Sequence, residues 1–462
     1  MISLYPDQSV VKDAVRDAMR SSKAILLQAS PGFGKTRLTA AMIEAAAIKG
    51  TRTMFVVPRR ELLAQTAETF NGFGIEHSYV SAKYELNPFV KTMIATSGTL
   101  ARRIADVPVP KLVFFDETHH GGAELNRIIQ HYKDAGSWVV GLSGTPERLD
   151  GRGLGCWYDV MVEGLPPSEL IEMGRLSEYR LFAPDAPDMT GIRKTAGDYA
   201  KGALADKMEG DRVLVGNAVK HYRQHAMGMI SIGFCVSIKH AEIMAQAFRD
   251  DGLKSEVIHG GLDDAQRKEL ILALARGGIH ELQSVDLLTF GFDLSMAAKM
   301  DVRVQSIGDY APTQSLPKQV QKWFRALRAG PTSIIRDHAG NSARHGLPDD
   351  AREWSLADKP KGTQGGGEKA EPVRQCQDCY FVHHPTPTCP NCGFEYPIAS
   401  RDIKEVEGEL LEVTAANKPP KKSQVIGRIA REGGRKGLEQ YAKENGYKSG
   451  WVSHQLRVRK LA

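Results

Sequence analysis

Short apolar runs alternate with stretches of helical periodicity over residues 1–164. Five continuous apolar runs predict buried strands at 24–28, 53–57, 91–95, 111–115 and 138–142. The first helix is predicted from apolar side chains that recur at helical spacing, namely Val10, Val11, Ala14, Val15, Ala18 and Met19. Because buried strands that alternate with helices build a parallel sheet covered on both faces, we expect an α/β domain over residues 1–164.

The alternation begins again after a poorly patterned stretch at 181–211, which we interpret as a connecting or inserted segment of unknown role. Strands are predicted at 230–234, 256–258, 285–288, 302–304 and 333–335, and helices at 237–250, 263–276 and 314–328. The pattern therefore predicts a second α/β domain over residues 165–345, and a fold of two tandem parallel-sheet domains.

The composition changes beyond residue 345. Residues 346–372 are expected to form a flexible linker, because the stretch 359–367 is rich in glycine, lysine and proline. A short cysteine-containing segment follows at 373–398. Residues 399–462 are expected to be basic and mostly helical, since the last 45 residues contain twelve lysines and arginines against three glutamates. Such a segment fits a phosphate-contacting surface or a solvated tail equally well.

The overall composition is that of an ordinary globular protein, with 462 residues, 42% hydrophobic and 25% charged side chains and a net charge of +6. This length suggests roughly two to four domains. No apolar run reaches the roughly 18 residues that a membrane span needs, and the first residues lack the features of a secretory signal. We therefore expect a cytoplasmic protein without membrane association.

Residues 29–36, with the sequence ASPGFGKT, follow an apolar strand and open into a helix. Backbone N–H groups around Gly32 and Gly34 can turn toward an anion, and the helix dipole adds a favourable potential. Lys35 is expected to reach the β- and γ-phosphates of ATP, and the hydroxyl of Thr36 to hold Mg²⁺. The segment begins with alanine where the strict phosphate-loop pattern has glycine.

An acidic pair ends another predicted strand. The apolar run 111–115 is followed directly by Asp116 and Glu117. A carboxylate at the tip of a strand near the phosphate loop is suited to hold Mg²⁺, which we assign to Asp116. Glu117 is then positioned to orient and deprotonate an attacking water. An isolated Asp-Glu pair usually belongs to a solvated loop, but the strand and the phosphate loop upstream favour catalysis.

Four of the six cysteines form two Cys-x2-Cys pairs, Cys376 with Cys379 and Cys389 with Cys392. Two such pairs nine residues apart are typical of a tetrahedral Zn²⁺ site. A pair of redox motifs is the competing interpretation, but neither pair opens a helix in a βαβ unit. The two histidines between the pairs are not assigned as ligands, because four cysteines complete the shell.

Two arginines, Arg325 and Arg328, lie three positions apart on the predicted helix 314–328 and are expected on one of its faces. Arginine supplies fixed, bidentate donors to phosphate. If this face meets the nucleotide of the first domain, the pair would stabilise charge on the transferring phosphoryl group. The alternative is a basic, solvated helix face.

These motifs occur in the order found in superfamily 2 helicases and translocases, and the chain resembles that superfamily from Tyr5 to Arg328. Residues 5–8 resemble the adenine-recognition element, and residues 29–36 resemble motif I, where alanine is common at the first position. Residues 116–119 are similar to the DExH form of motif II. The other matches are 57–62 to motif Ia, 95–100 to a strand-contacting motif, 143–145 to motif III, 289–293 to motif V and 321–328 to motif VI.

The resemblance implies that ATP and Mg²⁺ bind between two RecA-like domains. The nucleotide would be held by Gln8, Gly32, Gly34, Lys35, Thr36 and Asp116 from the first domain and by Gly291 and Asp293 from the second. Catalysis would involve Lys35, Asp116, Glu117, Gln321, Arg325 and Arg328, with Arg328 as the arginine finger. The resemblance assigns contacts with a nucleic-acid strand to Arg59, Arg60, Thr96, Ser97 and Thr99.

Two positions depart from the superfamily pattern. Gly144 stands where motif III usually has alanine, and Phe324 stands where motif VI usually has glycine. Within the superfamily the chain resembles RadD-like bacterial helicases and their phage relatives. The residues that carry this resemblance are 145–151, 312–315, the four cysteines and 446–451.

The resemblance implies an ATP-dependent helicase or translocase that acts on single-stranded or branched DNA in repair, recombination or replication, in a bacterial cell or a phage-infected host. Its protein partner would be a single-strand-binding, repair or replication protein. Two alternatives stay open: the motor subunit of a restriction-type system, and a branched-DNA-binding protein with little unwinding activity.

Overall fold

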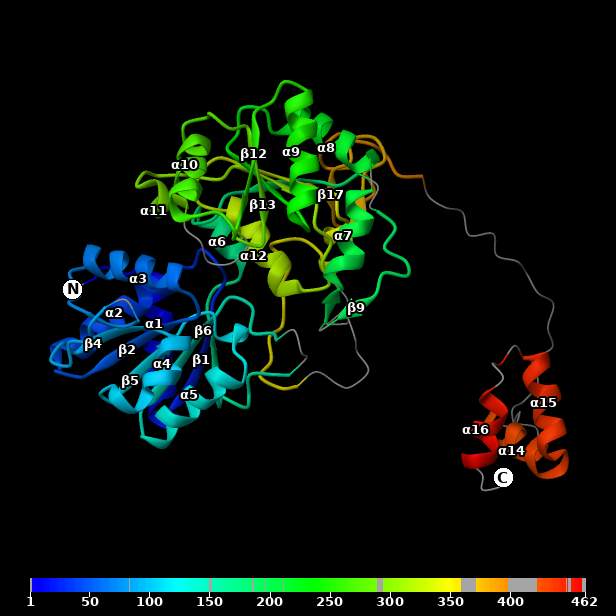
Figure 1. Cartoon of the computed structure of the whole chain (residues 1–462), viewed down its shortest axis with the longest axis horizontal. Coiled ribbons are helices and arrows are strands. Elements are labelled where there is room, and N and C mark those ends of the chain that lie inside the picture. Colours follow the sequence, from blue (N-terminus) through cyan, green and yellow to red (C-terminus); the bar gives the residue numbers. More distant parts are fainter. Residues whose placement is uncertain are drawn as a thin grey trace. The chain divides into compact units, whose positions relative to one another are not determined.

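The computed structural model describes residues 2–82, 84–148, 152–184, 187–195, 197–210, 212–288, 294–358, 371–397, 422–445, 447 and 450–458 (Figure 1). The chain divides into two compact units, residues 1–396 and 397–462. The described part of the first unit contains two large parallel sheets, which we call the sheets of lobe 1 and lobe 2, followed by the cysteine segment.

Lobe 1 is built on a sheet with the strand order β3-β4-β2-β5-β6-β1-β7, in which all neighbouring strands are parallel. Its strands are β1 (Ala24–Gln28), β2 (Thr53–Val57), β3 (Ser78–Val80), β4 (Thr92–Thr96), β5 (Leu112–Phe115), β6 (Trp138–Ser143) and β7 (Val160–Glu163). Its helices are α1 (Pro6–Ser21), α2 (Lys35–Ile48), α3 (Arg60–Gly72), α4 (Ser97–Arg103) and α5 (Ala123–Asp134).

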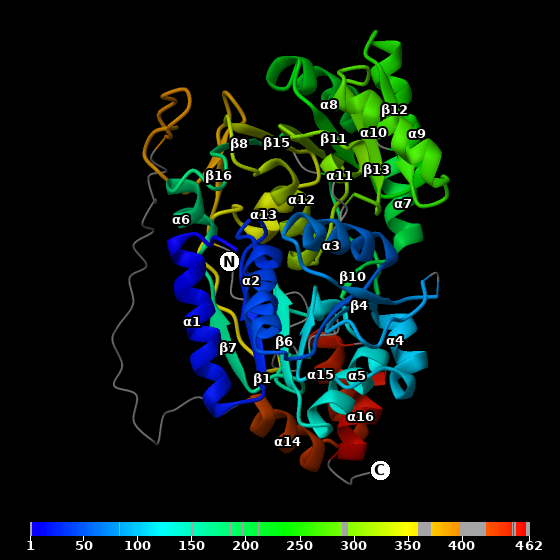
Figure 2. The same ribbon diagram turned by 90° about the vertical axis from the view of Figure 1, so that its left-hand side faces the viewer.

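Successive side chains on these buried strands pack on opposite faces of the sheet. Leu27 belongs to the core that includes apolar side chains of α2 and α3, whereas Leu26 belongs to the core that includes those of α4 and α5. Figure 2 shows helices on both sides of the strands of this sheet. Both faces are therefore covered, which explains why the strands are continuous apolar runs without alternation.

Lobe 2 contains a second parallel sheet, with the strand order β12-β13-β11-β14-β15-β8. Its strands are β8 (Tyr179–Phe182), β11 (Ser231–Phe234), β12 (Ser255–His259), β13 (Glu281–Val285), β14 (Ser306–Asp309) and β15 (Ser333–Asp337). Its helices are α6 (Pro167–Glu172), α7 (Lys201–Glu209), α8 (Arg212–His225), α9 (Ile238–Asp250), α10 (Asp264–Ala275), α11 (Leu294–Ala298), α12 (Leu316–Ala326) and α13 (Asn341–His345).

The predicted α/β class with two RecA-like sheets is confirmed, but two strands of lobe 2 were misplaced. The strand predicted at 285–288 lies at Glu281–Val285, and the strand predicted at 302–304 lies at Ser306–Asp309. Both predictions followed the most apolar residues, whereas the true strands contain polar residues that are buried in the sheet. The segment 181–211 includes the end of β8, the hairpin of β9 (Lys194–Thr195) and β10 (Asp198–Tyr199), and α7.

A buried ionic network accounts for these polar strands. Arg336 on β15 forms an ion pair with Glu281 on β13, and both side chains are at most 1% exposed. The guanidinium group also donates to the hydroxyls of Tyr310 (3.0 Å) and Ser231 (2.9 Å). These hydroxyls in turn donate to the two oxygens of Glu281, at 2.7 and 2.6 Å. The charges are thus paired and hydrogen-bonded, as buried charges must be.

The described part of the second unit consists of α14 (Lys422–Glu432), α15 (Gly434–Glu444) and α16 (Gly450–Val458). The three helices share an apolar core made of Ile426, Ala430, Leu438, Ala442, Val452 and Leu456. The rings of Tyr447 and Trp451 stack beside it, with centroids 4.5 Å apart. The predicted helical tail is therefore a small domain with a core of its own. None of the helices in the described ranges is long and apolar enough to cross a membrane.

Replacing Arg336 by methionine is expected to destabilise the protein by about 3–5 kcal/mol, because the carboxylate of Glu281 would stay buried without a cation. Urea unfolding followed by intrinsic fluorescence, to which the buried Trp323 of lobe 2 contributes, measures this loss. The matched control is Arg223→Met, which opens a half-exposed ion pair with Asp251 and should cost about 1 kcal/mol or less. Equal losses in the two variants would contradict the role of the network.

Candidate nucleotide site and zinc centre

The phosphate loop of lobe 1 joins β1 to α2. Gly32 and Gly34 have φ values of +88° and +90°, a region that side chains rarely enter. A Cβ atom on Gly32 would lie 2.5 Å from a methyl carbon of Leu176, and one on Gly34 would lie 2.5 Å from the amide nitrogen of Gln8. Both positions therefore require glycine. Lys35 begins α2, and its Nζ donates to the carbonyl oxygen of Ala29 at 2.8 Å.

The acidic pair lies at the carboxyl end of β5, near the phosphate loop. The charge of Lys35, which follows that loop, acts on both carboxyl groups. Glu117 has a left-handed backbone (φ +45°), a strained conformation that is often found at functional sites. Burial and the neighbouring carboxylate of Glu117 raise the pKa of Asp116 to about 7, although Lys35 opposes the shift. Burial also disfavours the charged form of Glu117, but His119, Lys35 and Gln321 outweigh it and lower its pKa.

His119 links the acidic pair to the end of β6, a contact that the sequence did not reveal. Its Nδ1 lies 2.8 Å from the hydroxyl of Ser143 and 3.4 Å from Oε2 of Glu117. The hydroxyl of Ser143 accepts the N–H of Thr145 at 3.1 Å. Burial lowers the pKa of His119 to about 3, so the ring is neutral at physiological pH. The predicted motifs II and III are thus joined by hydrogen bonds.

Helix α12 of lobe 2 reaches this acidic pair. Nε2 of Gln321 donates to Oε1 of Glu117 at 3.3 Å, across 204 residues of sequence. Arg325 lies one turn further along α12 and therefore on the same side of the helix as Gln321. Arg328 does not, because α12 ends at Ala326 and the prediction of a helix to residue 328 is wrong. The backbone carbonyl of Arg328 instead accepts the Nε–H of Arg303 at 3.1 Å.

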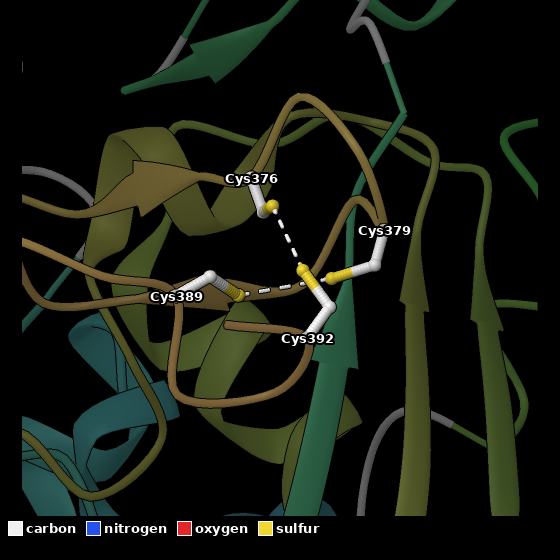
Figure 3. A group of neighbouring side chains, drawn as sticks. All are labelled: Cys376, Cys379, Cys389 and Cys392. Atoms are coloured by element: carbon white, nitrogen blue, oxygen red, sulfur yellow. Dashed lines mark hydrogen bonds between the residues drawn. The ribbon is translucent and has the colours of Figure 1, made fainter. Parts of the chain in front are cut away.

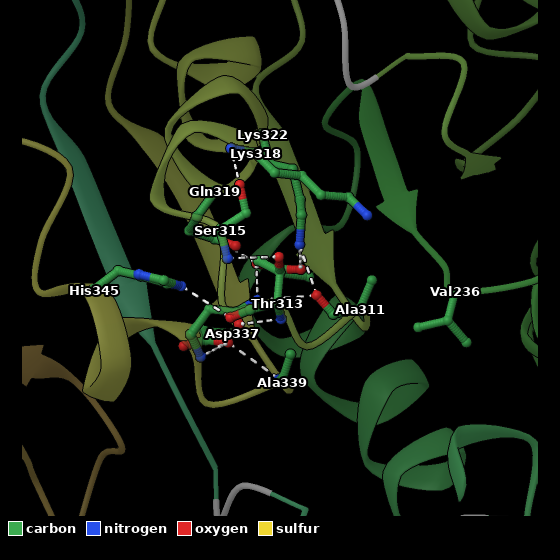
Figure 4. A network of polar contacts seen from close by, with 12 residues as sticks. Val236, Ala311, Thr313, Ser315, Lys318, Gln319, Lys322, Asp337, Ala339 and His345 are labelled. Carbon is green, nitrogen blue, oxygen red and sulfur yellow. Dashed lines mark hydrogen bonds and ion pairs between the residues drawn. The ribbon is translucent and has the colours of Figure 1, made fainter. Parts of the chain in front are cut away.

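A buried network fixes α12 on lobe 2 (Figure 4). Nζ of Lys322 donates to Oδ1 of Asp309 at 2.6 Å and to the carbonyl oxygen of Ala311 at 2.7 Å. The other oxygen of Asp309 accepts the amides of Gln319 (2.7 Å) and Asn341 (2.9 Å). Burial lowers the pKa of Lys322, and the facing carboxylate of Asp309 opposes this shift. The helix that carries Gln321 and Arg325 is thus held by its own inner face.

The hairpin β9-β10 docks beside this network. Asp198 accepts hydrogen bonds from the hydroxyl of Thr313 and the N–H of Gln314, both at 2.7 Å. The amide of Gln314 donates to the hydroxyl of Tyr199 at 2.7 Å. The segment whose role the sequence left open therefore braces the loop that leads into α12.

Of the predicted nucleotide contacts, Gln8 is described by the structure, whereas those of the second lobe are not. Gln8 is fully buried, where its Nε2 donates to the carbonyl oxygen of Phe33 (2.7 Å) and its Oε1 accepts the N–H of Tyr5 (3.1 Å). Base recognition by Gln8 stays a prediction. Gly291 and Asp293 lie outside the described residues, as does the rest of the predicted motif V.

The residues present fit a nucleotide with Mg²⁺. The loop turns through two glycines with positive φ, the backbone conformation from which anion-binding nests are built. Oε2 of Glu117 is buried and has no hydrogen-bond partner in the described part of the chain. Hydroxyl and carboxylate oxygens are the ligands that Mg²⁺ prefers, and Thr36 and Asp116 supply them. The site thus combines groups that suit an anion, a pair of oxygens that suits a cation, and a buried carboxylate oxygen without a hydrogen-bond partner in the described residues.

The predicted strand-contacting residues of lobe 1 divide into two groups. Arg59 and Arg60 are exposed and Ser97 is half-buried, at the carboxyl ends of β2 and β4. Thr96 and Thr99 are buried, and their hydroxyls bond to each other at 3.1 Å. Side-chain contacts with a ligand at this edge therefore belong to the first group.

The four predicted zinc ligands lie together. Sγ of Cys376 is 3.6 Å from that of Cys392, Sγ of Cys379 is 3.7 Å from that of Cys389, and all four lie within 4.8 Å of one another (Figure 3). Although burial opposes it, hydrogen bonds from backbone N–H groups and a neighbouring thiol lower the pKa of Cys376 to about 6. Four converging sulfurs, one of them readily ionised, suit a tetrahedral Zn²⁺.

The cysteine segment is attached to lobe 2 through edge strand β8. The N–H of Ala183 donates to the carbonyl oxygen of Tyr380 at 3.0 Å, and Phe182 pairs with Phe381 in an antiparallel bridge. The ring of Phe182 also stacks on His225 of α8, with centroids 4.1 Å apart. This cysteine segment, which we call the ribbon, therefore covers a sheet edge that would otherwise be exposed.

Comparison with known proteins bears on the family of the first lobe and on the fold. Residues 1–148 match the sequence family described as "Type III restriction enzyme, res subunit". Among solved structures, the DNA-bound ATP-dependent type ISP restriction-modification enzyme LlaBIII has a TM-score of 0.55 at 13% identity, over 76% of this chain and 28% of that enzyme. The family match of the first lobe, the fold and the ordered motifs all agree with the resemblance of this chain to superfamily 2 helicase-type ATPases.

Two relatives extend the match beyond the first lobe. A "51.5 kDa protein" of a Lactococcus phage (isolate 7-9) is 29% identical over 394 residues, which are 84% of this chain and 82% of the phage protein. The "Putative ATP-dependent helicase IRC3" of Saccharomyces cerevisiae is 23% identical over 341 residues, which are 70% of this chain and 48% of the yeast protein. This chain thus spans about half the length of the yeast relative. The narrower RadD-like resemblance is not confirmed by these relatives and stays a prediction, as do the predicted domain boundaries.

Loss of zinc is expected to loosen lobe 2, because the ribbon that covers β8 depends on the four thiolates. Cys379→Ser should abolish stoichiometric zinc, measured by metal analysis of the purified protein, and lower the melting temperature. The exposed Cys156 offers a matched control, and Cys156→Ser should change neither quantity. A variant free of zinc that melts like the wild type would show that the ribbon does not support the lobe.

Proposed function

We propose that the protein is a DNA-dependent ATPase that moves along or remodels DNA by closing and opening its two lobes. The observation that carries this proposal is the hydrogen bond from Gln321 of lobe 2 to Glu117 of lobe 1. It brings the helix with Arg325 to the carboxylate that is best suited to activate water. A hydrolytic site that needs both lobes makes ATP turnover depend on their closure.

Residues of both lobes have roles in the proposed reaction. The loop around Gly32 and Gly34, with Lys35, would hold the phosphates, and Thr36 with Asp116 would hold Mg²⁺. Bound Mg²⁺ would neutralise charge that develops on the phosphoryl group. Glu117 would orient the attacking water and accept its proton through the oxygen that has no partner in the described residues. Arg325 and Arg328 would stabilise charge on the phosphoryl oxygens, Arg325 from α12 and Arg328 from the segment that follows the helix.

Single-stranded or branched DNA is the proposed polymer. The type ISP enzyme with the same fold is described as bound to DNA, and two yeast relatives are described as putative ATP-dependent helicases. Arg59, Arg60 and Ser97 lie at the strand ends of lobe 1, the edge at which α/β sheets bind ligands. Arginine contacts to phosphate carry no base code, so we expect weak sequence preference and strong salt dependence. Repair, recombination or replication, with a single-strand-binding protein as partner, is the setting that we propose.

A second candidate function is the motor of a restriction-type system. It is favoured by the match of residues 1–148 to the res-subunit family and by the likeness to the type ISP enzyme. Such a motor would need a nuclease and a methyltransferase from other proteins. Co-purification of either from the native host would favour this candidate over a motor that works without them.

Lys35→Ala should abolish DNA-stimulated ATP hydrolysis, because it removes the cation that meets the phosphates, while DNA binding stays largely intact. Phosphate release is measured with single-stranded, duplex and forked DNA and with RNA side by side, and DNA binding by fluorescence anisotropy. The exposed Lys111→Ala is the matched control. Unchanged turnover in Lys35→Ala, or no stimulation of the wild type by any polymer, would contradict the proposal.

A further inference from the structure

Arg175 lies in the connector that leads from the last strand of lobe 1 to the first strand of lobe 2. It follows α6 and lies four residues before the start of β8, and its side chain is 13% exposed. Its guanidinium group forms an ion pair with Asp7 in the first turn of α1 and donates to the carbonyl oxygen of Phe33 in the phosphate loop. A single connector residue thus contacts two separate parts of the nucleotide site.

The two contacts of Arg175 converge with those of Gln8. Nε2 of Gln8 also donates to the carbonyl oxygen of Phe33, at 2.7 Å. The carbonyl between the two left-handed glycines therefore accepts two donors, one from α1 and one from the connector. Because both lone pairs of this carbonyl are used, the peptide between Phe33 and Gly34 has a fixed orientation. That peptide carries the N–H of Gly34, which belongs to the anion cradle.

Packing reinforces this clamp. The guanidinium carbon of Arg175 lies 4.4 Å from the ring centroid of Tyr5 and 5.4 Å from that of Phe33. The neighbouring Leu176 is buried against Gly32, at the other side of the same loop. Residues 175–176 therefore hold the phosphate loop at both of its strained glycines.

We propose that Arg175 is a positioning residue that sets the phosphate loop for nucleotide and ties its conformation to the connector between the lobes. The proposal rests on the proposed function only in assuming that the loop binds ATP. β8 begins three residues after Leu176 and hydrogen-bonds to β15 of lobe 2. Movement of lobe 2 would pull on the loop, and by linkage nucleotide binding would restrain the connector.

Arg175→Ala is expected to raise both KM for ATP and Kd for fluorescent ADP by about tenfold, because the loop loses a charged donor. kcat at saturating ATP should change by less than about threefold, because no group that touches the reacting atoms is altered. The melting temperature should stay within about 3 °C of the wild type. The control is Arg20→Ala, which removes an exposed arginine from the end of α1 and should leave all of these unchanged.

Two further variants keep the test decisive if Arg175→Ala does not fold. Arg175→Lys can keep the ion pair with Asp7 but cannot donate to both partners in one plane, so its nucleotide Kd should lie between wild type and alanine. Asp7→Asn weakens the anchor from the other side and should also raise Kd. Wild-type affinity in both variants would overturn the proposal.

Hydrogen exchange distinguishes a positioning role of Arg175 from a merely structural one. Fluorescent ADP should slow amide exchange of residues 173–178 in the wild type and leave it unchanged in Arg175→Ala. Equal protection in the two proteins would refute the link to the connector. A wild type that binds ADP but is not stimulated by DNA would refute the proposed function alone, since nucleotide affinity and exchange still test Arg175.

Discussion

An ion pair inside lobe 2 fixes the helix that reaches the acidic pair of lobe 1. Lys322 and Asp309 are at most 1% exposed, and the pair holds the inner face of α12 against the ends of the second sheet. Leaving either charge without the other inside the lobe would be strongly destabilising, so the helix has little freedom to rotate or slide. Gln321, the residue directly before Lys322, then points outward to Glu117 of lobe 1.

The two lobes communicate through two physically separate routes. One passes through α12 to the acidic pair, and from there through His119 to Ser143 at the end of β6. The other passes through the connector, where Arg175 holds the carbonyl of Phe33. In the proposed function, the first route would place groups that act on the phosphoryl oxygens, and the second would set the loop that receives the phosphates. A motor needs both routes, because ATP turnover and binding of the polymer must change together when the lobes close.

Much of lobe 1 could be predicted from the sequence, because its five central strands are buried and mostly apolar and its site residues follow directly after them. The edge strands β3 and β7 are short and partly exposed, and they were not predicted. Lobe 2 was harder, since Glu281 and Gln283 lie on a buried strand and are satisfied by partners on other strands far away in sequence. No local pattern reveals that Arg336 compensates Glu281. The four-cysteine site could be predicted because the spacing of the two Cys-x2-Cys pairs is typical of a zinc site.

Long-range contacts also account for the site residues that were missed. His119 and Lys322 act through partners on other elements, and Arg175 stands in a connector without any periodic pattern. The predicted helix included Arg328 and placed it on the same face as Arg325, whereas the observed helix ends at Ala326. Periodicity could not place that end, because Leu327 continues the apolar pattern while its backbone has already turned away.

The central claim is that an arginine of lobe 2 completes a hydrolytic site whose acidic residues belong to lobe 1. Single-turnover ATP hydrolysis by Arg325→Ala in the presence of DNA tests it most directly, with ATP affinity measured in parallel. The account predicts a fall of about 10³-fold in the rate with affinity changed far less, as for other arginine fingers. Hydrolysis at the wild-type rate would contradict it.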